Sequence, residues 1–368
     1  MTSGSTSARS LAADATMGAG QDHLGGRRVK GVAVNRPPIA RMRDVARHAG
    51  VSHQTVSRVI NHPDQVSPTT RARVVRAIEE LGYKRNSAAR ALSVNRSGTI
   101  GVIDSGSRVF GQEVMLVSVE GAARDAGYAT SVALVRSQDD EGVREAFEHL
   151  VELHVEGIVV MGNTVALAEA AAHVATRIPL AMVSSSEVHA PQIIRVAPAT
   201  AEAGRVATRH LVEQGFSRIA HIAGPEGWLD AHAREAGWRT ELAAHGLADG
   251  PVFRGDWMPE AGYRAGQAIA AAGSYDAVFA ANDHMALGAL FAFSEAGLRV
   301  PDDIAIIGFD DIVGTAFFQP PLSTIRQNFD LIGRHCIDQL LAAINGEEAH
   351  DVVVPTELVV RKSSLRPA

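Results

Sequence analysis

The sequence predicts a fold in two parts, a small all-α domain near the N-terminus followed by an α/β body of two doubly wound lobes. Three observations support this expectation. Between residues 41 and 96, short segments of helical spacing follow one another with tight turns between them. From Thr99 onward, short β-branched runs alternate with amphipathic segments, which is typical of βαβ units. The chain has 368 residues, 46% of them apolar, and is long enough for two or three compact units.

The first two helices of the small domain follow one another almost directly. We expect the first from Met42 to Gly50, and the second to begin after Ser52, whose side chain can cap it. On the second helix, Val56, Val59 and Ile60 face inward, and the outward positions are those of His53, Gln54, Thr55 and Arg58. Two short helices joined by a tight turn form a helix-turn-helix.

A third helix should complete the core of this domain. It begins at Ser67 and Pro68, an N-cap followed by proline in the first turn, and ends near Gly82. Its apolar residues are Val74, Val75, Ile78 and Leu81. Three helices of this size enclose a minimal core.

The body should consist of parallel strands separated by helices. We expect strands at 99–103, 129–135, 157–161, 179–184, 218–224, 276–282 and 303–309. The helices between them should cover 112–126, 142–153, 201–214, 229–245 and 284–296. Two doubly wound lobes fit this length.

Charge is distributed unevenly along the chain. Residues 1–40 carry five basic and two acidic side chains, residues 41–96 carry eleven and four, and the remainder carries nineteen and thirty-five. The net charges of these segments are therefore +3, +7 and −16. A basic head on an acidic body suits a protein that binds phosphates at one end. Charge alone leaves a solvated basic face equally possible.

Several classes of protein are disfavoured by composition. No apolar run reaches the length of a membrane span, and the first twenty residues lack the pattern of a signal peptide, so we expect a cytoplasmic protein without membrane partners. The single cysteine, Cys336, excludes an intramolecular disulfide and a cysteine-rich zinc site. It lies in an apolar helical stretch and should be a packed core thiol. No metal or cofactor motif is present.

A series of short motifs closely resembles the headpiece of the lactose-repressor (LacI) family. The matching residues are Asp44-Val-Ala, Ala49-Gly-Val-Ser, Gln54-Thr-Val-Ser-Arg-Val, Asn61, Val66-Ser, Thr70-Arg and Leu81-Gly-Tyr. The resemblance extends over about residues 41–366. It implies a sequence-specific DNA-binding regulator whose body has the type I periplasmic-binding-protein fold, with crossover strands that include 323–327.

The resemblance also implies a division of the chain. Residues 1–40 would be a disordered extension, either a flexible arm or the product of a misassigned start. Residues 41–85 would form the helix-turn-helix domain, residues 86–96 a hinge helix and linker, and residues 97–368 the ligand-binding and dimerisation domain.

In the family, the second helix lies in the DNA major groove. By position, His53 and Gln54 would read base edges, with Arg58 one turn later. Glutamine can pair bidentately with adenine and arginine with guanine. Side chains sized for phosphate contacts are Ser52, Thr55, Ser57 and Asn61. Because a close family member has tyrosine where this chain has His53, the operator sequence does not carry over. The alternative is an ordinary polar surface of a helical bundle.

The segment from Asn86 to Ser93 resembles the hinge helix of the family. Leu92 would wedge into the minor groove and kink the DNA, and Ala89 would let two hinge helices pack closely. An isolated helix this short is unstable in water, so it should form only with the dimer partner and DNA present. The alternative is that Leu92 is an ordinary packing residue.

Candidate ligand contacts follow the strands of the body, because ligands of such sheets bind at the carboxyl ends of strands. The family positions match ligand contacts and wall residues at Arg234, Trp257, Asn282, Asp310, Gln327 and Phe329. Asp104 and Ser105 follow the first strand and join this set. A planar aromatic with carboxylate, amide and guanidinium groups suits a hydroxylated ring, although Trp257 alone would more simply be a core residue. Ser184 and Met161 replace an aspartate and an asparagine of a close member, which bears on the ligand's identity more than on its class.

The predicted function is a repressor of sugar-utilisation genes. The unliganded homodimer would hold its hinge helices on a palindromic operator, and a neutral mono- or disaccharide in the cleft would close the lobes and melt the hinges. A purine-responsive regulator with the opposite sign of response stays open. A dimer is expected because no leucine heptad follows Val359.

Two other classes of protein share parts of this pattern. An enzyme could be imagined from Asp310 and Asp311 with His284 or His221, but glycine-rich phosphate motifs and metal-ligand spacing are absent from the sequence. A solute-binding transport protein shares the body fold, but it would need a signal peptide and no DNA-binding head.

Overall fold

The computed structural model describes residues 40–83, 96–106, 110–135, 140–162, 164–185 and 192–366. It divides into two compact units, residues 1–85 and residues 86–368, which we call the head and the body. The expectations for residues 1–39 and for the hinge helix, including Ala89 and Leu92, lie outside the described residues.

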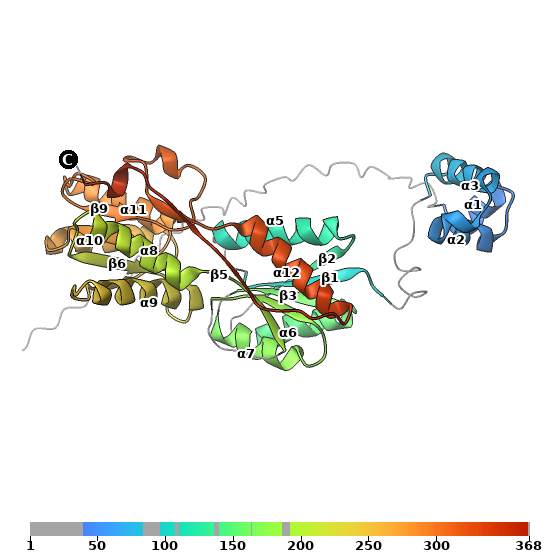
Figure 1. The fold of residues 1–368 in the computed structure, drawn as a ribbon, viewed down its shortest axis with the longest axis horizontal. Coiled ribbons are helices and arrows are strands. Elements are labelled where there is room, and N and C mark those ends of the chain that lie inside the picture. Colours follow the sequence, from blue (N-terminus) through green and yellow to red (C-terminus); the bar gives the residue numbers. More distant parts are fainter. Residues whose placement is uncertain are drawn as a thin grey trace, which may run out of the picture. The chain divides into compact units, whose positions relative to one another are not determined.

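The head is a bundle of short helices (Figure 1). Its elements are α1 (Met42–His48), α2 (His53–Asn61), the 3-10 turn η1 (Pro63–Gln65) and α3 (Pro68–Glu80). Two predicted caps are confirmed: the Ser52 hydroxyl accepts a hydrogen bond from the Thr55 amide at 3.1 Å, and Ser67 accepts one from the Thr70 amide at 3.4 Å. The helix-turn-helix therefore forms as expected.

The core of the head contains apolar residues from all three helices. The buried members are Val45, Ala46, Ala49, Val56, Val59, Val74 and Ala77. Val75, an apolar residue of the predicted third helix, is instead 41% exposed, because its neighbour Val74 takes the inward position.

The first lobe of the body contains a six-stranded, wholly parallel sheet in the order β11-β5-β4-β3-β1-β2. Its strands are β1 (Thr99–Asp104), β2 (Ala129–Leu134), β3 (Gly157–Met161), β4 (Leu180–Val183), β5 (Ile193–Pro198) and β11 (Val352–Val354). One face packs against α5 (Phe110–Asp125) and α12 (Phe329–Ile344), and the other against α6 (Asp140–Glu152) and α7 (Val165–Val174) (Figure 1). Cys336 of α12 is fully buried, as predicted, and burial raises the pKa of its thiol to about 12.

The second lobe contains a parallel sheet in the order β7-β6-β8-β9. Its strands are β6 (Ile219–Ala223), β7 (Val252–Arg254), β8 (Ala277–Ala280) and β9 (Ala305–Ile307). The helices α8 (Thr200–Glu213) and α9 (Leu229–Ala244) contribute to one apolar cluster, and α10 (Pro259–Ala272) and α11 (Asp283–Glu295) contribute to another. An antiparallel pair, β10 (Thr324–Arg326) and β12 (Glu357–Val359), lies beside β9, joined to it by a bridge from Ile307 to Ser323.

The chain passes between the lobes three times, after β5, after β10 and after β11. The helix α12 therefore packs on the first lobe although it follows a strand of the second. The expected crossover at 323–327 coincides with β10. The two-lobed doubly wound body is confirmed. Within the described residues, no helix is long and apolar enough to cross a membrane.

Candidate functional site

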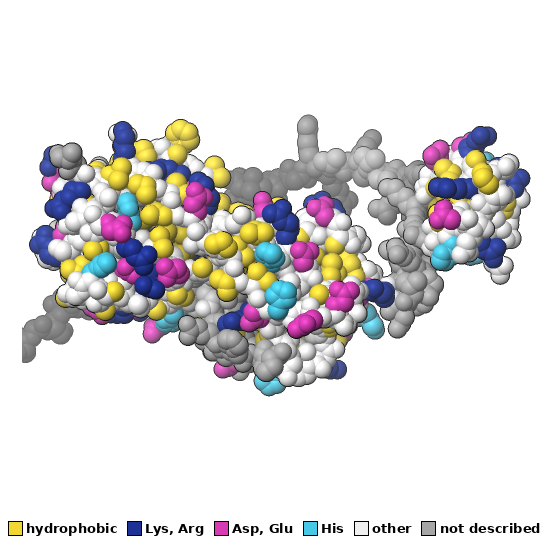
Figure 2. All heavy atoms as spheres, viewed as in Figure 1, with side chains coloured by type: hydrophobic (Ala, Val, Ile, Leu, Met, Phe, Trp, Pro, Cys, Tyr) yellow, Lys and Arg dark blue, Asp and Glu magenta, His cyan; other side chains and the backbone are white. Residues whose placement is uncertain are grey.

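The head presents a polar, basic surface on and around α2. His53, Gln54 and Arg58 are exposed, as are Ser52 and Asn61. Thr55 and Ser57 are half-buried, and both take part in local hydrogen bonds: Ser52 Oγ lies 2.9 Å from Thr55 Oγ1, and Asn61 donates to Ser57 at 3.3 Å. The arginines of the described part of the head are all exposed, namely Arg41, Arg43, Arg47, Arg58, Arg71, Arg73 and Arg76. Figure 2 shows basic side chains on the visible face of the head.

The acidic residues of the head do not lie on α2. That helix contains no Asp or Glu. Asp44 of α1 pairs with Arg47 at 3.6 Å, and Glu80 at the end of α3 lies 2.6 Å from His48. The exposed face of α2 therefore carries hydrogen-bonding and basic groups only, which suits contact with base edges and phosphates.

The body contains a cleft lined by residues of both lobes. Six of the eight predicted contacts line it: Arg234, Trp257, Asn282, Asp310, Gln327 and Phe329. The other two, Asp104 at the end of β1 and Ser105 directly after it, are not among the residues that line the cleft. The rule that sites form at the carboxyl ends of parallel strands thus locates the cleft.

Arg234 of α9 is fixed deep in the second-lobe wall. Its side chain is 6% exposed and donates to the Ala281 carbonyl. Its guanidinium carbon lies 3.8 Å from the centroid of the Phe309 ring, and Nη2 lies 3.6 Å from Asp310 Oδ1. The Nε–H has no hydrogen-bond partner among the described residues. A buried, oriented guanidinium with an unused donor is suited to a polar ligand atom.

Asp310 faces Arg234 from the loop after β9. Its backbone φ is +106°, a conformation that costs a non-glycine residue about 1–3 kcal/mol and is typical of functional sites. Gln327 donates to its Oδ1 at 2.8 Å. Burial raises the pKa of Asp310 to about 6, and Arg234 and Gln327 oppose that rise. The carboxylate is thus held ready to accept further hydrogen bonds.

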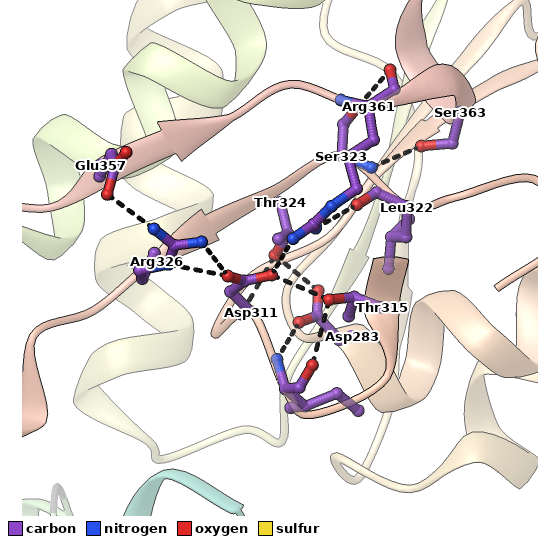
Figure 3. Close-up of polar contacts among 11 residues, drawn as sticks. Asp283, Asp311, Thr315, Leu322, Ser323, Thr324, Arg326, Glu357, Arg361 and Ser363 are labelled. Atoms are coloured by element: carbon purple, nitrogen blue, oxygen red, sulfur yellow. Dashed lines mark hydrogen bonds and ion pairs between the residues drawn. The ribbon is translucent and has the colours of Figure 1, made fainter. Parts of the chain in front are cut away.

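Asp311 has different partners from its neighbour. Its carboxylate accepts hydrogen bonds from Thr315, Arg326 and Arg361, each at 2.8 Å (Figure 3), and Asp311 is not among the residues that line the cleft. Arg326 belongs to β10, and Arg361 follows β12. Asp311 therefore links the loop after β9 to β10 and to the segment after β12. It does not form an acid–base pair with Asp310.

Asn282 and Gly224 hold Trp257 in place. Asn282 caps α11 by accepting from the Met285 amide at 2.9 Å, and its Nδ2 donates to the Trp257 carbonyl at 3.0 Å. Trp257 has a φ of +72°. A Cβ at Gly224 would lie 2.2 Å from the Cη2 of its indole, so only glycine lets the ring lie there. Asn282 thus lines the cleft and also holds the backbone of Trp257 in place.

Asp104 and Ser105 are buried in the first lobe, outside the lining of the cleft. The Asp104 carboxylate accepts from the Gly106 amide at 2.7 Å, and burial raises its pKa. Ser105 donates to Gln112 Oε1 at 2.7 Å, and Gln112 lines the cleft. The structure therefore places Ser105 one residue away from the cleft surface.

Nine of the lining residues were not predicted as contacts, and three of these nine have a polar or aromatic side chain, namely Gln112, Trp228 and Asp230. The Trp228 ring meets Trp257 edge-on, with centroids 5.8 Å apart. Asp230, in the first turn of α9, accepts a hydrogen bond from Ser185 of the first lobe. Trp228 and Asp230 follow the carboxyl end of β6, as Asn282 follows that of β8. The rule that ligands bind at the carboxyl ends of strands would therefore have found these two residues if it had been applied beyond Gly224.

A helix-turn-helix head and a two-lobed body with a polar, aromatic cleft define a ligand-responsive DNA-binding regulator. Comparison with known proteins agrees with this class. Residues 41–86 match the family described as bacterial regulatory proteins, lacI family, and residues 208–364 match a periplasmic binding protein-like domain. The chain belongs to the LacI family.

The similarity extends over most of the chain. The lactose operon repressor of Escherichia coli (strain K12) is 33% identical over 88% of this chain and 90% of its own length. The HTH-type transcriptional repressor PurR of Pasteurella multocida (strain Pm70) is 36% identical, covering 88% and 98%. Among solved structures, the lac repressor dimer bound to operator and the anti-inducer ONPF superposes with a TM-score of 0.82 at 32% identity, covering 89% of this chain and 99% of that one.

Proposed function

We propose that this protein is a homodimeric repressor that binds a palindromic operator through α2 and is released by a sugar. The main support for this proposal is the cleft in the body, where Arg234, Asp310 and Asn282 lie together with Trp257. The same chain presents the exposed polar face of α2 in its head. The lac repressor structure is a dimer on its operator, and another relative of known structure, the regulator CelR, was solved in complex with cellobiose. Both support this proposal.

The polar groups of the cleft suit a neutral hydroxylated ring. Asp310 and Asp230 are acceptors, Arg234 is the cation of the described lining residues, and Trp257 offers a ring for stacking. Two carboxylates against one guanidinium disfavour an anionic or phosphorylated ligand. Sugar hydroxyls both donate and accept, so they can satisfy this set.

The second candidate is a regulator that a purine activates for DNA binding. A planar base could stack on Trp257, and the similarity to PurR of Pasteurella multocida favours this alternative. Both candidates use the same cleft, with opposite signs of the response.

Release from DNA would follow from closure of the lobes. The three chain crossings connect the lobes, so ligand contacts in the cleft can rotate the first lobe relative to the second. In the dimer this movement would separate the two hinge segments, where Leu92 is the proposed minor-groove wedge and Ala89 the proposed contact between the paired hinge helices. A coupling free energy of about 1–3 kcal/mol is typical of such switches.

The test is operator binding measured by fluorescence anisotropy, with DNA selected from a random library. A panel of galactosides, glucosides, lactose, cellobiose, hypoxanthine and guanine would be added in turn. We expect at least one sugar to weaken operator binding. The variant Asp310→Ala should bind the operator but no longer respond, because each lost charged hydrogen bond costs about 1.5–3 kcal/mol.

The matched control is Asp302→Ala, which removes a carboxylate from an exposed pair with Arg299. It should respond as the wild type does. A purine that strengthens operator binding would establish the second candidate instead, and absence of any selected DNA would refute both.

A further inference from the structure

The chain enters the body at a cluster of polar contacts just before β1. Residues 84–95 lie outside the described part, and Arg96 is the first described residue of the body. Its Nε donates to Glu156 Oε2 at 2.7 Å, and its Nη2 donates to the Tyr128 hydroxyl at 2.9 Å and to Asn345 Oδ1 at 3.4 Å. These partners directly precede β3, directly precede β2 and end α12. We call Arg96, Tyr128, Glu156 and Asn345 the linker anchor.

The carboxylate of the linker anchor is held from a second side. Glu156 is 10% exposed, and its Oε1 accepts a hydrogen bond from the Gly98 amide at 2.6 Å. The Arg96 side chain is 48% exposed, and an ion pair with so exposed a partner contributes little to folding stability. A planar guanidinium with fixed partners in three separate segments does, however, define where it lies. The anchor therefore fixes the position of the chain more than it stabilises the lobe.

Without the contacts of Arg96, the first fixed point of the body would be Gly98. The Gly98 amide binds Glu156, and its carbonyl accepts from the Ala129 amide at 2.9 Å. Gly98 has a φ of +64°, and glycine moves between this left-handed conformation and others at little cost. Release of Arg96 would thus add two residues, or about 7 Å of reach, to the tether between the head and the body. In a dimer, both tethers would gain this length.

The length of the tether matters because a dimer must place two heads on two half-sites at once. Both half-sites are occupied only if their separation matches the separation that the protein allows. One base pair inserted at the centre of an operator moves the half-sites apart by about 3.4 Å and rotates them by about 34°. Two tethers that are each about 7 Å longer could follow such an insertion, whereas tethers held at Arg96 could not.

We propose that Arg96 sets the half-site spacing that this repressor accepts, because it fixes the length of the tether that carries each head. This inference rests on the proposed function, in which a homodimer binds a palindromic operator. Arg96 is a positioning residue. Its described contacts lie within the body, and it acts on the DNA through the twelve residues, 84–95, that join it to the head.

Spacing tolerance of the full chain tests the inference. Fluorescence anisotropy titrations would use the selected operator and two derivatives, with one or two base pairs inserted at its centre. Wild type should bind each derivative roughly tenfold or more weakly than the original operator, because one head loses its half-site. Arg96→Gln should bind the original operator within about threefold of wild type, since a slightly longer tether lowers the effective concentration little. It should lose only about threefold or less when one base pair is inserted.

Two further variants separate position from charge. Glu156→Gln removes the carboxylate from the other side of the pair, while its amide oxygen can still accept from the Gly98 amide. This variant should show the same tolerance as Arg96→Gln. The matched control is Arg144→Gln, which loses an exposed pair with Glu148 on α6 and should keep the spacing preference of the wild type. The urea unfolding midpoint of Arg96→Gln should stay close to that of the wild type, because the lost ion pair is half exposed.

The possible failures are distinct. If Arg96→Gln shows the same penalty for inserted base pairs as wild type, or weakens binding to all three operators equally, the anchor does not set the spacing. If wild type binds all three operators equally well, no tether limits its reach. In these cases the inference is wrong while the proposed function stands. If no palindromic operator is selected, or the protein on DNA is a monomer by light scattering, the proposed function is wrong, and this inference with it.

Discussion

His221 should make the stability of the body depend on pH. It lies in β6 with no exposed surface, stacked between the rings of Trp238 and Phe279 at centroid distances of 5.3 and 4.8 Å. Its Nδ1 lies 2.9 Å from the Phe279 carbonyl, and its Nε2 has no partner among the described residues. Burial lowers the pKa of His221 from 6.5 to about 4.

The direction of the effect follows from proton binding. Between pH 6.5 and about pH 4, the unfolded chain holds a proton on His221 and the folded chain does not. The stabilisation is therefore complete above pH 6.5 and is lost as the pH falls through this range. At 1.36 kcal/mol per pKa unit, the loss is about 3 kcal/mol.

Three carboxyl groups act in the opposite direction. Burial raises the pKa of Asp310 to about 6 and also raises that of Asp104, and burial together with Asp310 raises that of Asp283. All three groups bind protons more readily in the folded state, so they add stability as the pH falls. The contribution of His221 must therefore be obtained from the difference between two proteins.

The comparison is wild type against His221→Phe, which keeps a ring and removes the titrating group. Urea unfolding followed by tryptophan fluorescence reports the body alone, because the three tryptophans Trp228, Trp238 and Trp257 all lie there. The stability of the variant relative to wild type should rise by about 3 kcal/mol between pH 7 and pH 4.

The exposed His149 provides the matched control, and His149→Phe should change stability by less than about 0.5 kcal/mol. A difference between wild type and His221→Phe that stays constant from pH 7 to pH 4 would refute the reasoning.

Three further predictions concern the cleft, the crossing strands and the head. Gly224→Ala should displace the Trp257 ring and weaken effector binding about tenfold or more, because its Cβ would lie 2.2 Å from the indole; in calorimetry, Gly121→Ala, at an open position of α5, should bind like wild type. Asp311→Asn should lower the unfolding free energy in urea by about 2 kcal/mol, because Asp311 loses its charged hydrogen bonds to two arginines. An unchanged urea midpoint would show that Asp311 does not stabilise the contact with β10 and the segment after β12. Gln54→Ala should weaken cognate operator binding by about 1–3 kcal/mol in anisotropy titrations and leave random DNA nearly unaffected; equal losses on both would show that Gln54 reads no base.

Much of the fold could be predicted because most elements have clear patterns and clear ends. The caps Ser52 and Ser67 mark helix starts, and the β-branched runs in the body mark strands. The helix α7 was not predicted because its sequence VALAEAAAHV is apolar on nearly all sides and shows no helical period. The short strands β7 and β11, three residues each, carry too little pattern to be recognised.

The cleft was predicted less completely than the fold. The strand-end rule found Asn282 and Asp310, but it does not tell which way a side chain turns. Asp104 turns onto the Gly106 amide, a local contact that competes with the cleft. In the sequence, Met161 is notable only as a departure from a family member. In the folded chain it lines the cleft together with the apolar residues Met115 and Val183, which come from other elements.

The three passages of the chain between the lobes constrain how the protein can be synthesised. The first lobe receives β5 early, but its edge strand β11 and its covering helix α12 come only after the whole second lobe. At about 5–20 residues per second, the ribosome needs roughly 8–30 seconds to proceed from the end of β5 to the end of β11. During that time the apolar surface that α12 later covers, which includes Val159 and Ala181, is open to other chains. Nascent-chain chaperones should therefore protect this half-finished sheet, and neither lobe can be expressed as one uninterrupted stretch of the gene.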